Sequence, residues 1–589
     1  MRKLVITNNQ ITDSKGCPVA AELIYKYLEE NFGAKIRKQL PNLRFRENPI
    51  NAFLLIEGRF PDSLQLSCCV THSSYNHRID PLQDQVIINN KWWFGIRSES
   101  LITLNTILSR KELSYGNITF KQYVSLLTDP GIALHVLDES CETEKFSDWD
   151  LGQYQALPLG LEVEQMHPFQ EVGQGVLRIF SGHDMGCLLA DEMGLGKTLQ
   201  AITLLLATSE RGSSLVVAPA SLLMNWKKEL EKFAPSLTTH VHAGNNRHGI
   251  KSALLNYDVV ICSYETLVLD QSWISKIEWN VIALDEAQAI RNHSTRRAIA
   301  VKKLSCRVPL AITGTPVENY LSDLWSIYEF IFPELLGSKE RFDHVFPDEV
   351  HFAERLGSVV SNFTIRRKLE EVALDLPDRT DIERPIIPSE ELAEEHHNLS
   401  LEKAPFSNQQ KKRVLCSHAD DEMTFRNFLE TPKTEMLREI CERVFAKGQK
   451  LLIFTSFIQT IDYIHDFIIN YFPGVKVEVL SGQLKQSMRE SLVDDFNKSP
   501  GAGCLVINPT VGGTGLNITG ANSLIHFTPE WNPAQTEQAS KRIHRIGQRL
   551  PVFIYYFYYV DTIEHRAMET AEFKRQIQGG VDVGIRGQI

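Results

Sequence analysis

Hydrophobic residues between positions 151 and 335 occur in short, almost uninterrupted runs, and amphipathic segments separate the runs. Strands that are buried on both faces have this continuous pattern, and their alternation with helices indicates a parallel sheet. We therefore expect an α/β lobe here that binds its ligand at the carboxyl ends of the strands. The expected strands are Cys187 to Ala190, Leu215 to Pro219, Val259 to Cys262, Val281 to Leu284 and Leu310 to Thr313.

A second series of the same kind lies within residues 431–589 and predicts a second parallel α/β lobe. Between the two lobes, over residues 336–430, the alternation weakens, and we expect a helical insert and linker. Pro377, Pro385 and Pro388 favour extended connections there. The expected strands of the second lobe are Leu451 to Phe454, Val475 to Leu480, Cys504 to Ile507, Leu524 to Phe527 and Val552 to Phe557.

Residues 1–150 predict a small α+β domain that carries no recognisable catalytic motif. Its expected strands lie at 51–57 and 85–88, and its expected helices at 102–108 and 120–127. The cluster Trp92-Trp93-Phe94 indicates either core packing or a contact surface for a partner or for DNA. The acidic segment from Asp138 to Asp150 is typical of a solvated linker, so we place a domain boundary there.

Composition narrows the class of protein. The 589 residues carry a formal net charge of −11, so any DNA site must be a local basic groove. No apolar run is long enough to span a membrane, and the segment from Met1 to Asn8 turns polar too soon for a signal peptide. The ten cysteines contain no CxxC pair, which favours a reduced, cytoplasmic protein without structural zinc.

The segment from Asp191 to Thr198 combines a strand end, a glycine-containing turn and a helix start, the order that a phosphate cradle requires. Backbone N–H groups of the turn and the helix dipole favour an anion. Lys197 would reach the β- and γ-phosphates of a nucleotide, and the Thr198 hydroxyl would hold Mg²⁺. Asp191 stands where the first glycine of the GxxxxGK[ST] pattern is expected, and a glycine-rich turn without function is the alternative.

Asp285 and Glu286 follow the fourth expected strand of this lobe. Two adjacent carboxylates at a buried strand end are costly without a cation, so Asp285 would help to hold Mg²⁺ and Glu286 would position or deprotonate the attacking water. The alternative is that they are acidic caps of the next helix. The hydroxyls of Thr313 to Pro316, after the next strand, would sense the nucleotide state, unless this is a plain turn.

Further candidates lie on either side of these motifs. Ahead of the phosphate loop, Phe169 would stack on a nucleobase and the Gln170 amide would read an adenine edge, although a plain helix start also explains this segment. The glycine-rich turn from Val511 to Asn517 suits close approach of backbone to a nucleotide or a DNA strand, or is a flexible loop. The basic clusters Arg366 to Lys368 and Lys411 to Arg413 are solvated helix faces or contacts to a DNA backbone.

The segment from Gln538 to Gln548 is rich in basic residues. On a helix, Gln538, Arg542 and Arg545 would share one face. Arginines from a second lobe that reach a phosphate loop offset the charge that develops in phosphoryl transfer, an effect of roughly 10³–10⁵ in rate. An ordinary basic helix is the alternative.

Together these motifs resemble the Swi/Snf-type branch of the superfamily-two helicase-related ATPases. An acidic residue at position 191 is normal in that family. Three features depart from its pattern: Gln288 replaces a histidine, Thr528-Pro529-Glu530 replaces an acidic-aromatic run, and Lys541 replaces an acidic residue. The resemblance rests on Phe169-Gln170, 191–198, 219–226, 285–288, 313–316, 366–368, 512–517, 531–533 and 538–548, and it leaves the region before the acidic segment unmatched.

The resemblance implies two RecA-like lobes that use ATP and Mg²⁺ to track along double-stranded DNA, usually without separating its strands. A strand-separating helicase and a nucleotide-switched protein that docks partner subunits through residues 1–150 remain open. The compact insert and the absence of histone-reading modules suggest a bacterial protein. Bacterial relatives serve in transcription recycling and in anti-phage defence, and we favour defence because the N-terminal domain resembles no polymerase-binding module. The implied catalytic residues are Lys197, Asp285, Glu286, Arg542 and Arg545, the implied nucleotide contacts are Gln170, Asp191, Gly194, Gly196, Lys197, Thr198 and Gly513, and the implied Mg²⁺ ligands are Thr198 and Asp285.

Overall fold

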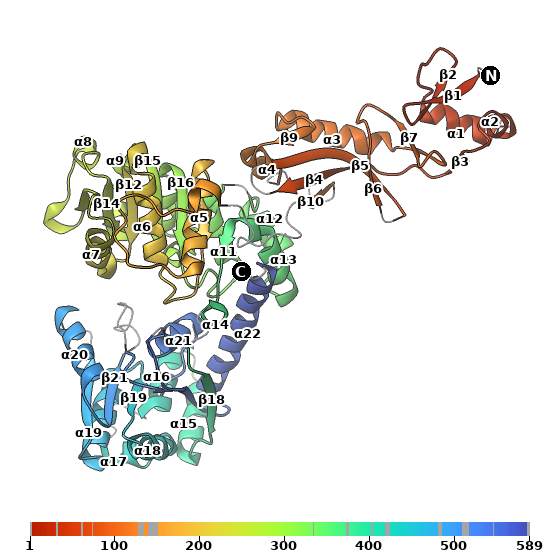
Figure 1. The fold of residues 1–589 in the computed structure, drawn as a ribbon. Coiled ribbons are helices and arrows are strands. Elements are labelled where there is room, and N and C mark those ends of the chain that lie inside the picture. The colour runs from red at the N-terminus through yellow and green to blue at the C-terminus, as the bar shows by residue number, and fades with distance from the viewer. Residues whose placement is uncertain are drawn as a thin grey trace. The chain divides into compact units, whose positions relative to one another are not determined.

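The computed structural model forms two compact units, which consist of residues 1–149 with 332–339 and of residues 150–331 with 340–589. Each unit is described by itself, with the helix and strand labels of Figure 1. The predicted linker beyond Asp138 and the glycine-rich turn with Gly513 lie outside the described residues. The structure describes residues 3–30, 33–59, 63–73, 75–127, 135–138, 151–333, 335–372, 376–401, 405–418, 425–480, 484, 486–508, 518–545 and 547–585.

The N-terminal unit has the predicted α+β character. A five-stranded sheet has the order β10-β4-β5-β6, with β9 paired to β5, and smaller sheets join β3-β8-β7 and β1-β2. The strands are β1 Leu4–Thr7, β2 Gln10–Asp13, β3 Arg44–Phe45, β4 Phe53–Arg59, β5 Ser63–His72, β6 Tyr75–Arg78, β7 Gln85–Ile88, β8 Trp92–Gly95, β9 Gly116–Ile118 and β10 Val136–Asp138. The helices are α1 Ala21–Glu29, α2 Gly33–Gln39, α3 Ser98–Arg110 and α4 Phe120–Leu127.

Trp93 and Phe94 are buried, as the core-packing interpretation predicts, whereas Trp92 is half-buried. The Trp93 indole N–H donates to Gln85 Oε1 at 2.8 Å, and the same oxygen accepts from the backbone of Ile11 at 3.0 Å. The Gln85 amide in turn donates to the carbonyl of Val19 at 2.6 Å. A buried amide with all these partners satisfies the polar groups of a small core and holds β2 against β7 and β8.

The first parallel sheet has seven strands in the order β13-β14-β12-β15-β16-β11-β17. Every pairing in it is parallel, so the strand ends that follow β11, β15 and β16 meet at one edge. All five predicted strands are confirmed, but the short strands β13 and β17 escaped prediction. The strands are β11 Cys187–Leu189, β12 Ser214–Ala218, β13 Thr239–Val241, β14 Val259–Ser263, β15 Glu278–Asp285, β16 Ser305–Ile312 and β17 Thr364–Ile365.

The second parallel sheet has six strands in the order β18-β23-β22-β19-β21-β20. Alternate residues of each central strand enter two different hydrophobic clusters: Leu451 and Ile453 of β19 belong to one, and Leu452 and Phe454 to the other. Both faces are therefore buried, which explains the continuous apolar runs. The strands are β18 Arg379–Ile386, β19 Lys450–Phe454, β20 Lys476–Leu480, β21 Gly503–Ile507, β22 Ser523–His526 and β23 Val552–Tyr559.

Residues 336–430 are mainly helical, but they also contribute one edge strand to each parallel sheet. Strand β17 pairs with β11 of the first sheet, and β18 pairs with β23 of the second. Pro385 lies in β18, an edge strand, where the missing N–H is tolerated. The helices here are α12 Lys339–Val345, α13 Val350–Val360, α14 Leu369–Val372, α15 Glu390–Leu401, α16 Pro405–His418 and α17 Phe425–Leu429.

The last helix, α22 Ile563–Gly584, packs against α13 of the insert. The two backbones approach so closely that a Cβ atom on Gly357 would collide with the carbonyl of Val581, and one on Gly584 with that of Glu354. Glycine at both positions allows this approach. The end of the chain thereby returns from the second sheet to the neighbourhood of the first.

Candidate nucleotide site at the strand ends of the first lobe

The predicted phosphate loop connects β11 to helix α6, Lys197–Ala207. Gly194 and Gly196 have φ angles of +92° and +74°, a region in which residues with a Cβ atom are strained. Gly196 caps α6, and a Cβ atom there would also collide with the side chain of Gln170. The turn therefore needs glycine at both positions, and it exposes the N-terminal N–H groups of an eleven-residue helix, which favour an anion.

The ammonium of Lys197 donates to the backbone carbonyls of Asp191, at 2.8 Å, and Glu192, at 3.1 Å. Burial lowers the pKa of Lys197, while the charges of Glu286, Asp191 and Asp285 oppose that effect. Lys197 thus lies between the phosphate loop and the carboxylates at the end of β15, where its predicted role requires it.

Asp191 is fully buried and forms an ion pair with Arg367, which follows β17. Arg367 Nε donates to Asp191 Oδ1 at 2.7 Å, and the Gln200 amide donates to Oδ2 at 3.1 Å. A buried carboxylate is costly unless a cation and hydrogen-bond donors surround it, and Arg367 and Gln200 supply these groups. Asp191 therefore anchors the loop to the edge strand, which explains an acidic residue at the first-glycine position.

Both interpretations of Arg366 and Arg367 as a surface cluster are wrong. These side chains are only 5% and 2% exposed. Arg366 Nη1 donates to the carbonyls of Ala190 and, at 3.0 Å, Gly314, and its Nε lies 3.1 Å from Asp582 of α22. The pair of arginines connects the phosphate loop, the loop after β16 and the last helix. These side chains therefore form buried structural contacts.

Gln170 lies at the start of helix α5, Pro168–Gly182. Its Oε1 accepts from the backbone N–H of His167 at 3.0 Å, and its Nε2 donates to the carbonyl of Leu195 at 3.1 Å. Phe169 packs with Leu195 and stacks on His167, with ring centroids 5.4 Å apart. The structure therefore brings Gln170 onto the phosphate loop, and its reading of adenine stays a prediction.

Asp285 ends β15 and is held by its neighbours. Trp226 Nε1 donates to Asp285 Oδ2 at 2.7 Å, and the Tyr264 hydroxyl donates to its backbone carbonyl at 2.8 Å. Burial, and next the charge of Glu286, raise the pKa of Asp285 to about 7. A carboxylate with so little compensating positive charge is a natural partner for a divalent cation.

Glu286 has a φ of +51°, an uncommon conformation for a residue other than glycine. It precedes the short helix Ala287–Ile290 without any side-chain capping bond, so the capping interpretation is wrong. Its Oε2 instead accepts from the Gln288 amide at 2.7 Å. Backbone strain at a carboxylate of this kind is typical of functional sites.

A relay of hydrogen bonds joins Glu286 to the loop after β16. Gln288 Oε1 accepts from the Thr313 hydroxyl at 2.7 Å, and Thr313 Oγ1 accepts from the backbone N–H of Thr315 at 3.1 Å. A Cβ atom on Gly314 would lie 3.5 Å from Lys197 Nζ, so this loop is also adjacent to the lysine. The segment 313–316 is therefore more than a plain turn.

The prediction that the arginines of the second lobe share one helix face is wrong. Helix α21, Pro533–Ser540, ends before them, and residues 541–545 form tight turns in which the Ser540 carbonyl accepts from Ile543 and His544. Arg542 is 5% exposed. Burial, and next the charge of Arg545, lower the pKa of Arg542 to about 10, and the charge of Glu286 opposes this shift. Arg542 thus interacts electrostatically with the Glu286 carboxylate of the first lobe.

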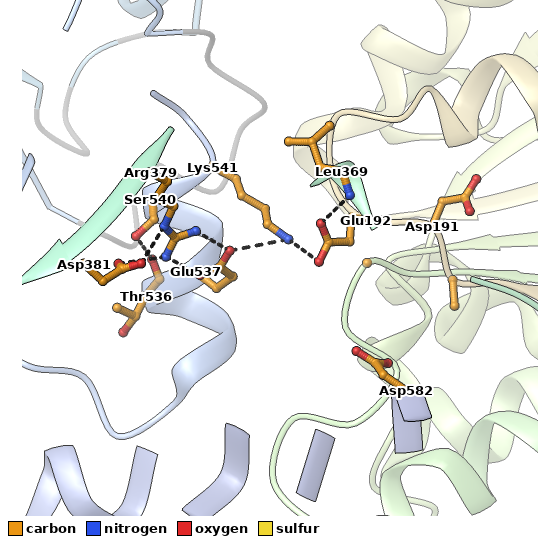
Figure 2. Close-up of polar contacts among 12 residues, drawn as sticks. Asp191, Glu192, Leu369, Arg379, Asp381, Thr536, Glu537, Ser540, Lys541 and Asp582 are labelled. Atoms are coloured by element: carbon orange, nitrogen blue, oxygen red, sulfur yellow. Dashed lines mark hydrogen bonds and ion pairs between the residues drawn. The ribbon is translucent and has the colours of Figure 1, made fainter. Parts of the chain in front are cut away.

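The residue before Arg542 contacts the phosphate loop directly (Figure 2). Lys541 Nζ lies 3.2 Å from Glu192 Oε1 and 3.5 Å from Glu537 Oε1. Glu192 Oε2 also accepts from the backbone N–H of Leu369 at 2.9 Å. Burial alone would raise the pKa of Glu192, but the charges of Lys541 and Arg366 hold this pKa below its usual value.

The oxygen donors at the site suit a magnesium ion. The Thr198 hydroxyl, in the first turn of α6, and the buried Asp285 carboxylate are hard oxygen donors of the kind that Mg²⁺ prefers. The motifs assigned no role at this site to Trp226, Arg367 or Asp582, although Trp226 and Arg367 lie in segments that carry the resemblance. Their spacing along the chain carries no signal, because all three contacts are made between distant segments.

These contacts define a protein of two parallel-sheet lobes, in which the phosphate loop of one lobe meets a basic segment of the other. Family comparison is more specific. The SNF2-related domain matches residues 87–445, and the helicase conserved C-terminal domain matches residues 432–547. The chain belongs to the SNF2-related family. The matched range begins at residue 87, inside the N-terminal region that the motif resemblance left unmatched.

Curated relatives carry helicase names. A Mycoplasma pneumoniae protein described as an uncharacterized ATP-dependent helicase is 33% identical over 71% of this chain and 42% of its own length. The Bacillus subtilis putative ATP-dependent helicase/translocase YwqA is 34% identical over 70% of this chain and 48% of its own. The Escherichia coli Zorya protein ZorD is 32% identical, over 63% and 40%. This chain therefore spans less than half the length of these relatives.

Among solved structures, the SWI2/SNF2 ATPase core of Sulfolobus solfataricus in complex with dsDNA is 31% identical to this chain. The match covers 72% of this chain and 95% of that chain, with a TM-score of 0.39. Within the described part of the chain, no helix is both long and apolar enough to cross a membrane.

Proposed function

We propose that this chain hydrolyses ATP between its two parallel-sheet lobes and uses the cycle to translocate along double-stranded DNA. The observation that carries the proposal is the contact of Lys541 with Glu192 at 3.2 Å. It brings the arginine segment of the second lobe to the phosphate loop of the first, where an arginine finger must act. Membership of the SNF2-related family supports the same activity.

Each residue has a task in this proposal. The α6 N-terminus, Lys197 and the glycines of the loop bind the phosphates, and Thr198 and Asp285 would hold Mg²⁺. The ion, when bound, offsets phosphate charge and polarises the transferred group. Glu286, oriented by Gln288, positions the attacking water and accepts its proton.

Arg542 supplies positive charge as the γ-phosphoryl group leaves. Its burial matters, because a guanidinium that is removed from water interacts more strongly with a developing negative charge. The relay from Glu286 through Gln288 to Thr313 connects the hydrolytic carboxylate to the loop after β16. It offers a route by which hydrolysis changes a neighbouring surface.

The direct test is ATP turnover with and without duplex DNA. We expect duplex stimulation in the wild type, a loss of at least 10²-fold for Lys197→Ala and Glu286→Gln, and roughly 10³-fold for Arg542→Ala. Glu278→Gln, at the other end of β15, and Arg549→Ala, an exposed neighbour of the arginine segment, serve as controls with near-normal turnover. Absence of stimulation by duplex, together with normal turnover of Lys197→Ala, contradicts the proposal.

Two alternatives have separate tests. A translocase displaces the third strand of a triplex but leaves a duplex closed, whereas a strand-separating helicase releases an oligonucleotide from the duplex. A nucleotide-switched docking protein would keep its ATPase but lose its cellular function when residues 1–150 are deleted. The pattern of the three assays therefore assigns one of the three activities.

We further propose a role in bacterial anti-phage defence. Its support is the similarity to the Zorya protein ZorD. Plaque counts on cells that carry the wild type or Lys197→Ala test this role. Equal plaque counts for the two over a panel of phages would contradict it, without bearing on the ATPase.

A further inference from the structure

Three cations surround one tryptophan in the N-terminal unit. The guanidinium carbon of Arg46 lies 4.4 Å from the Trp92 ring centroid, that of Arg44 lies 5.3 Å away, and the ammonium of Lys91 lies 5.9 Å away. We call these four residues the Trp92 patch. Arg44, Arg46 and Lys91 are exposed, and Trp92 is half-buried.

The backbone fixes where these side chains start. Strand β3 runs parallel to β8 with Arg44 opposite Trp92, and the Arg44 N–H donates to the Lys91 carbonyl at 2.7 Å. Lys91 follows Asn89 and Asn90, whose φ angles of +52° and +54° form the tight turn between β7 and β8. The charges therefore project from a paired, hydrogen-bonded part of the unit.

No counter-charge pairs with the patch among the residues that the structure describes. In the part of the chain that the structure describes, no ion pair or hydrogen bond joins a carboxylate to the side chain of Arg44, Arg46 or Lys91. Three like charges beside one ring repel one another, and the ring quadrupole offsets this by about 0.5–1 kcal/mol per exposed cation. Such a cluster gains most by binding an anion with several charges.

The sequence before the acidic segment is net basic as well. Residues 1–127 contain 16 Lys and Arg against 11 Asp and Glu, a net charge of +5 in a chain of −11. Helix α2, which leads into β3, adds Lys35, Arg37 and Lys38, all exposed. The sequence before the acidic segment is therefore net basic although the whole chain is acidic, which favours a local nucleic-acid site there.

We propose that the Trp92 patch binds the phosphate backbone of duplex DNA, as a contact outside the two lobes. Duplex DNA carries a phosphate about every 1.7 Å along its axis, the densest target for closely spaced cations. The cations lie over the Trp92 ring, and the His72 ring packs beside it with ring centroids 5.7 Å apart, so the ring holds guanidinium groups in place. Backbone binding without sequence readout follows.

A folded protein surface and an acidic peptide are the competing partners, and binding of polyglutamate tests the second. Protein interfaces depend on exposed aromatic or apolar anchors at their centre. Here the adjacent Trp93 and Phe94 are buried in the core, and the exposed groups are charged or are asparagines of the turn. This composition favours a polyanion over a folded protein surface.

The test uses the full chain carrying the triple substitution R44E/R46E/K91E, with binding of a fluorescent 30-base-pair duplex measured at several salt concentrations. We expect duplex binding near 100 mM salt to be at least tenfold weaker. We also expect the slope of log K against log salt concentration to become less steep by about two to three. ATP turnover at saturating duplex stays within about twofold. The matched control K3E/K15E/K26E changes net charge equally at exposed lysines that do not contact Trp92, and should shift Kd less than twofold.

The neutral variant R44Q/R46Q/K91Q, which should show about half of that effect, covers the case in which charge reversal unfolds the unit. Wild-type affinity and salt dependence in both patch variants, or an equal loss in the control, overturns the proposal. It is also overturned if the patch variants lose affinity for a polyglutamate peptide but not for duplex. A different result would contradict the proposed translocase activity, namely a wild-type ATPase that does not respond to DNA.

Discussion

The ammonium of Lys541 lies 3.2 Å from a carboxylate oxygen of Glu192, and this ion pair joins the second lobe to the phosphate loop of the first. The family resemblance leads one to expect an acidic residue at position 541. The lysine turns a repulsion with Glu192 into an attraction. Figure 2 shows that Glu537, Arg379 and Asp381 continue the alternation of charges into the second sheet.

The first prediction concerns this pair. Lys541→Glu places a negative charge against Glu192 and Glu537, in a contact whose two partners are only 11% and 16% exposed. We expect kcat for ATP to fall by about tenfold, because loss of a partly buried ion pair costs on the order of 1–2 kcal/mol. Lys541→Arg should stay within about threefold of wild type. Steady-state kinetics with saturating duplex measures both.

The control is Lys476→Glu, which reverses the charge of an exposed lysine paired within the same lobe with Glu478. It should leave kcat unchanged. The double variant Glu192→Lys with Lys541→Glu restores opposite charges, so its kcat should exceed that of either single variant. If the double variant is no better than the worse single one, the attraction between these two residues has no role in turnover.

The second prediction is a pH dependence. With the pKa of Asp285 raised to about 7, the carboxyl is protonated below that pH and ionised above it. Because the ionised form would hold Mg²⁺, kcat/KM for Mg·ATP should rise with pH through about 7 and then level. Trp226→Phe removes the N–H that stabilises the anion, so the rise should move to higher pH by about one to two pH units.

Trp279→Phe is the matched control. Trp279 is equally buried in the same lobe, and among the described residues its indole N–H has no hydrogen-bond partner. This variant loses the same atoms and should keep the rise near pH 7. A rise at the same pH in all three proteins would mean that a group other than Asp285 controls the profile.

The third prediction concerns the relay between Glu286 and Thr313. Gln288→Leu removes the amide that holds Glu286 and leaves the Thr313 hydroxyl without its acceptor. We expect turnover to fall by about 10- to 100-fold with ATP binding within about threefold, since the loss is in orientation of the hydrolytic carboxylate. Gln288→His retains one donor and one acceptor and should stay within about threefold. Equal turnover in the Leu and His variants would argue against the relay.

The fourth prediction is an acid sensitivity of the second lobe. His526 is buried, and burial, with the charge of Arg379, lowers its pKa to about 3. Between pH 3 and 6.5 the unfolded chain therefore binds one proton more than the folded one, so stability rises with pH across that window. On going from pH 7.5 to 5.5, the wild type should lose about 1.4 kcal/mol more than His526→Gln.

Urea unfolding followed by hydrogen exchange of β22 peptides measures this difference. Gln can replace the hydrogen bond of His526 to Ser540, at 3.1 Å, but it does not titrate. An identical pH dependence in the two proteins would show that His526 is not the group responsible.

The sequence alone determined the two parallel sheets and the phosphate loop of this protein. Short uninterrupted apolar runs such as Val259 to Cys262, which alternate with amphipathic segments, favour strands that are buried on both faces. The loop is equally local, because Gly194 and Gly196 take left-handed conformations within a few residues of Lys197. Neither inference needed knowledge of which distant segments meet.

What only the tertiary structure decided is which charges are compensated, and by whom. Asp191 and Arg367 are 176 residues apart, and β17, which brings them together, has only two residues and no pattern of its own. Surface clusters and internal ion pairs have the same composition, so Arg366 and Arg367 read as exposed until their burial is seen. The partner of Lys541 depends in the same way on the meeting of two lobes, because electrostatic energy follows distance in space and not separation along the chain.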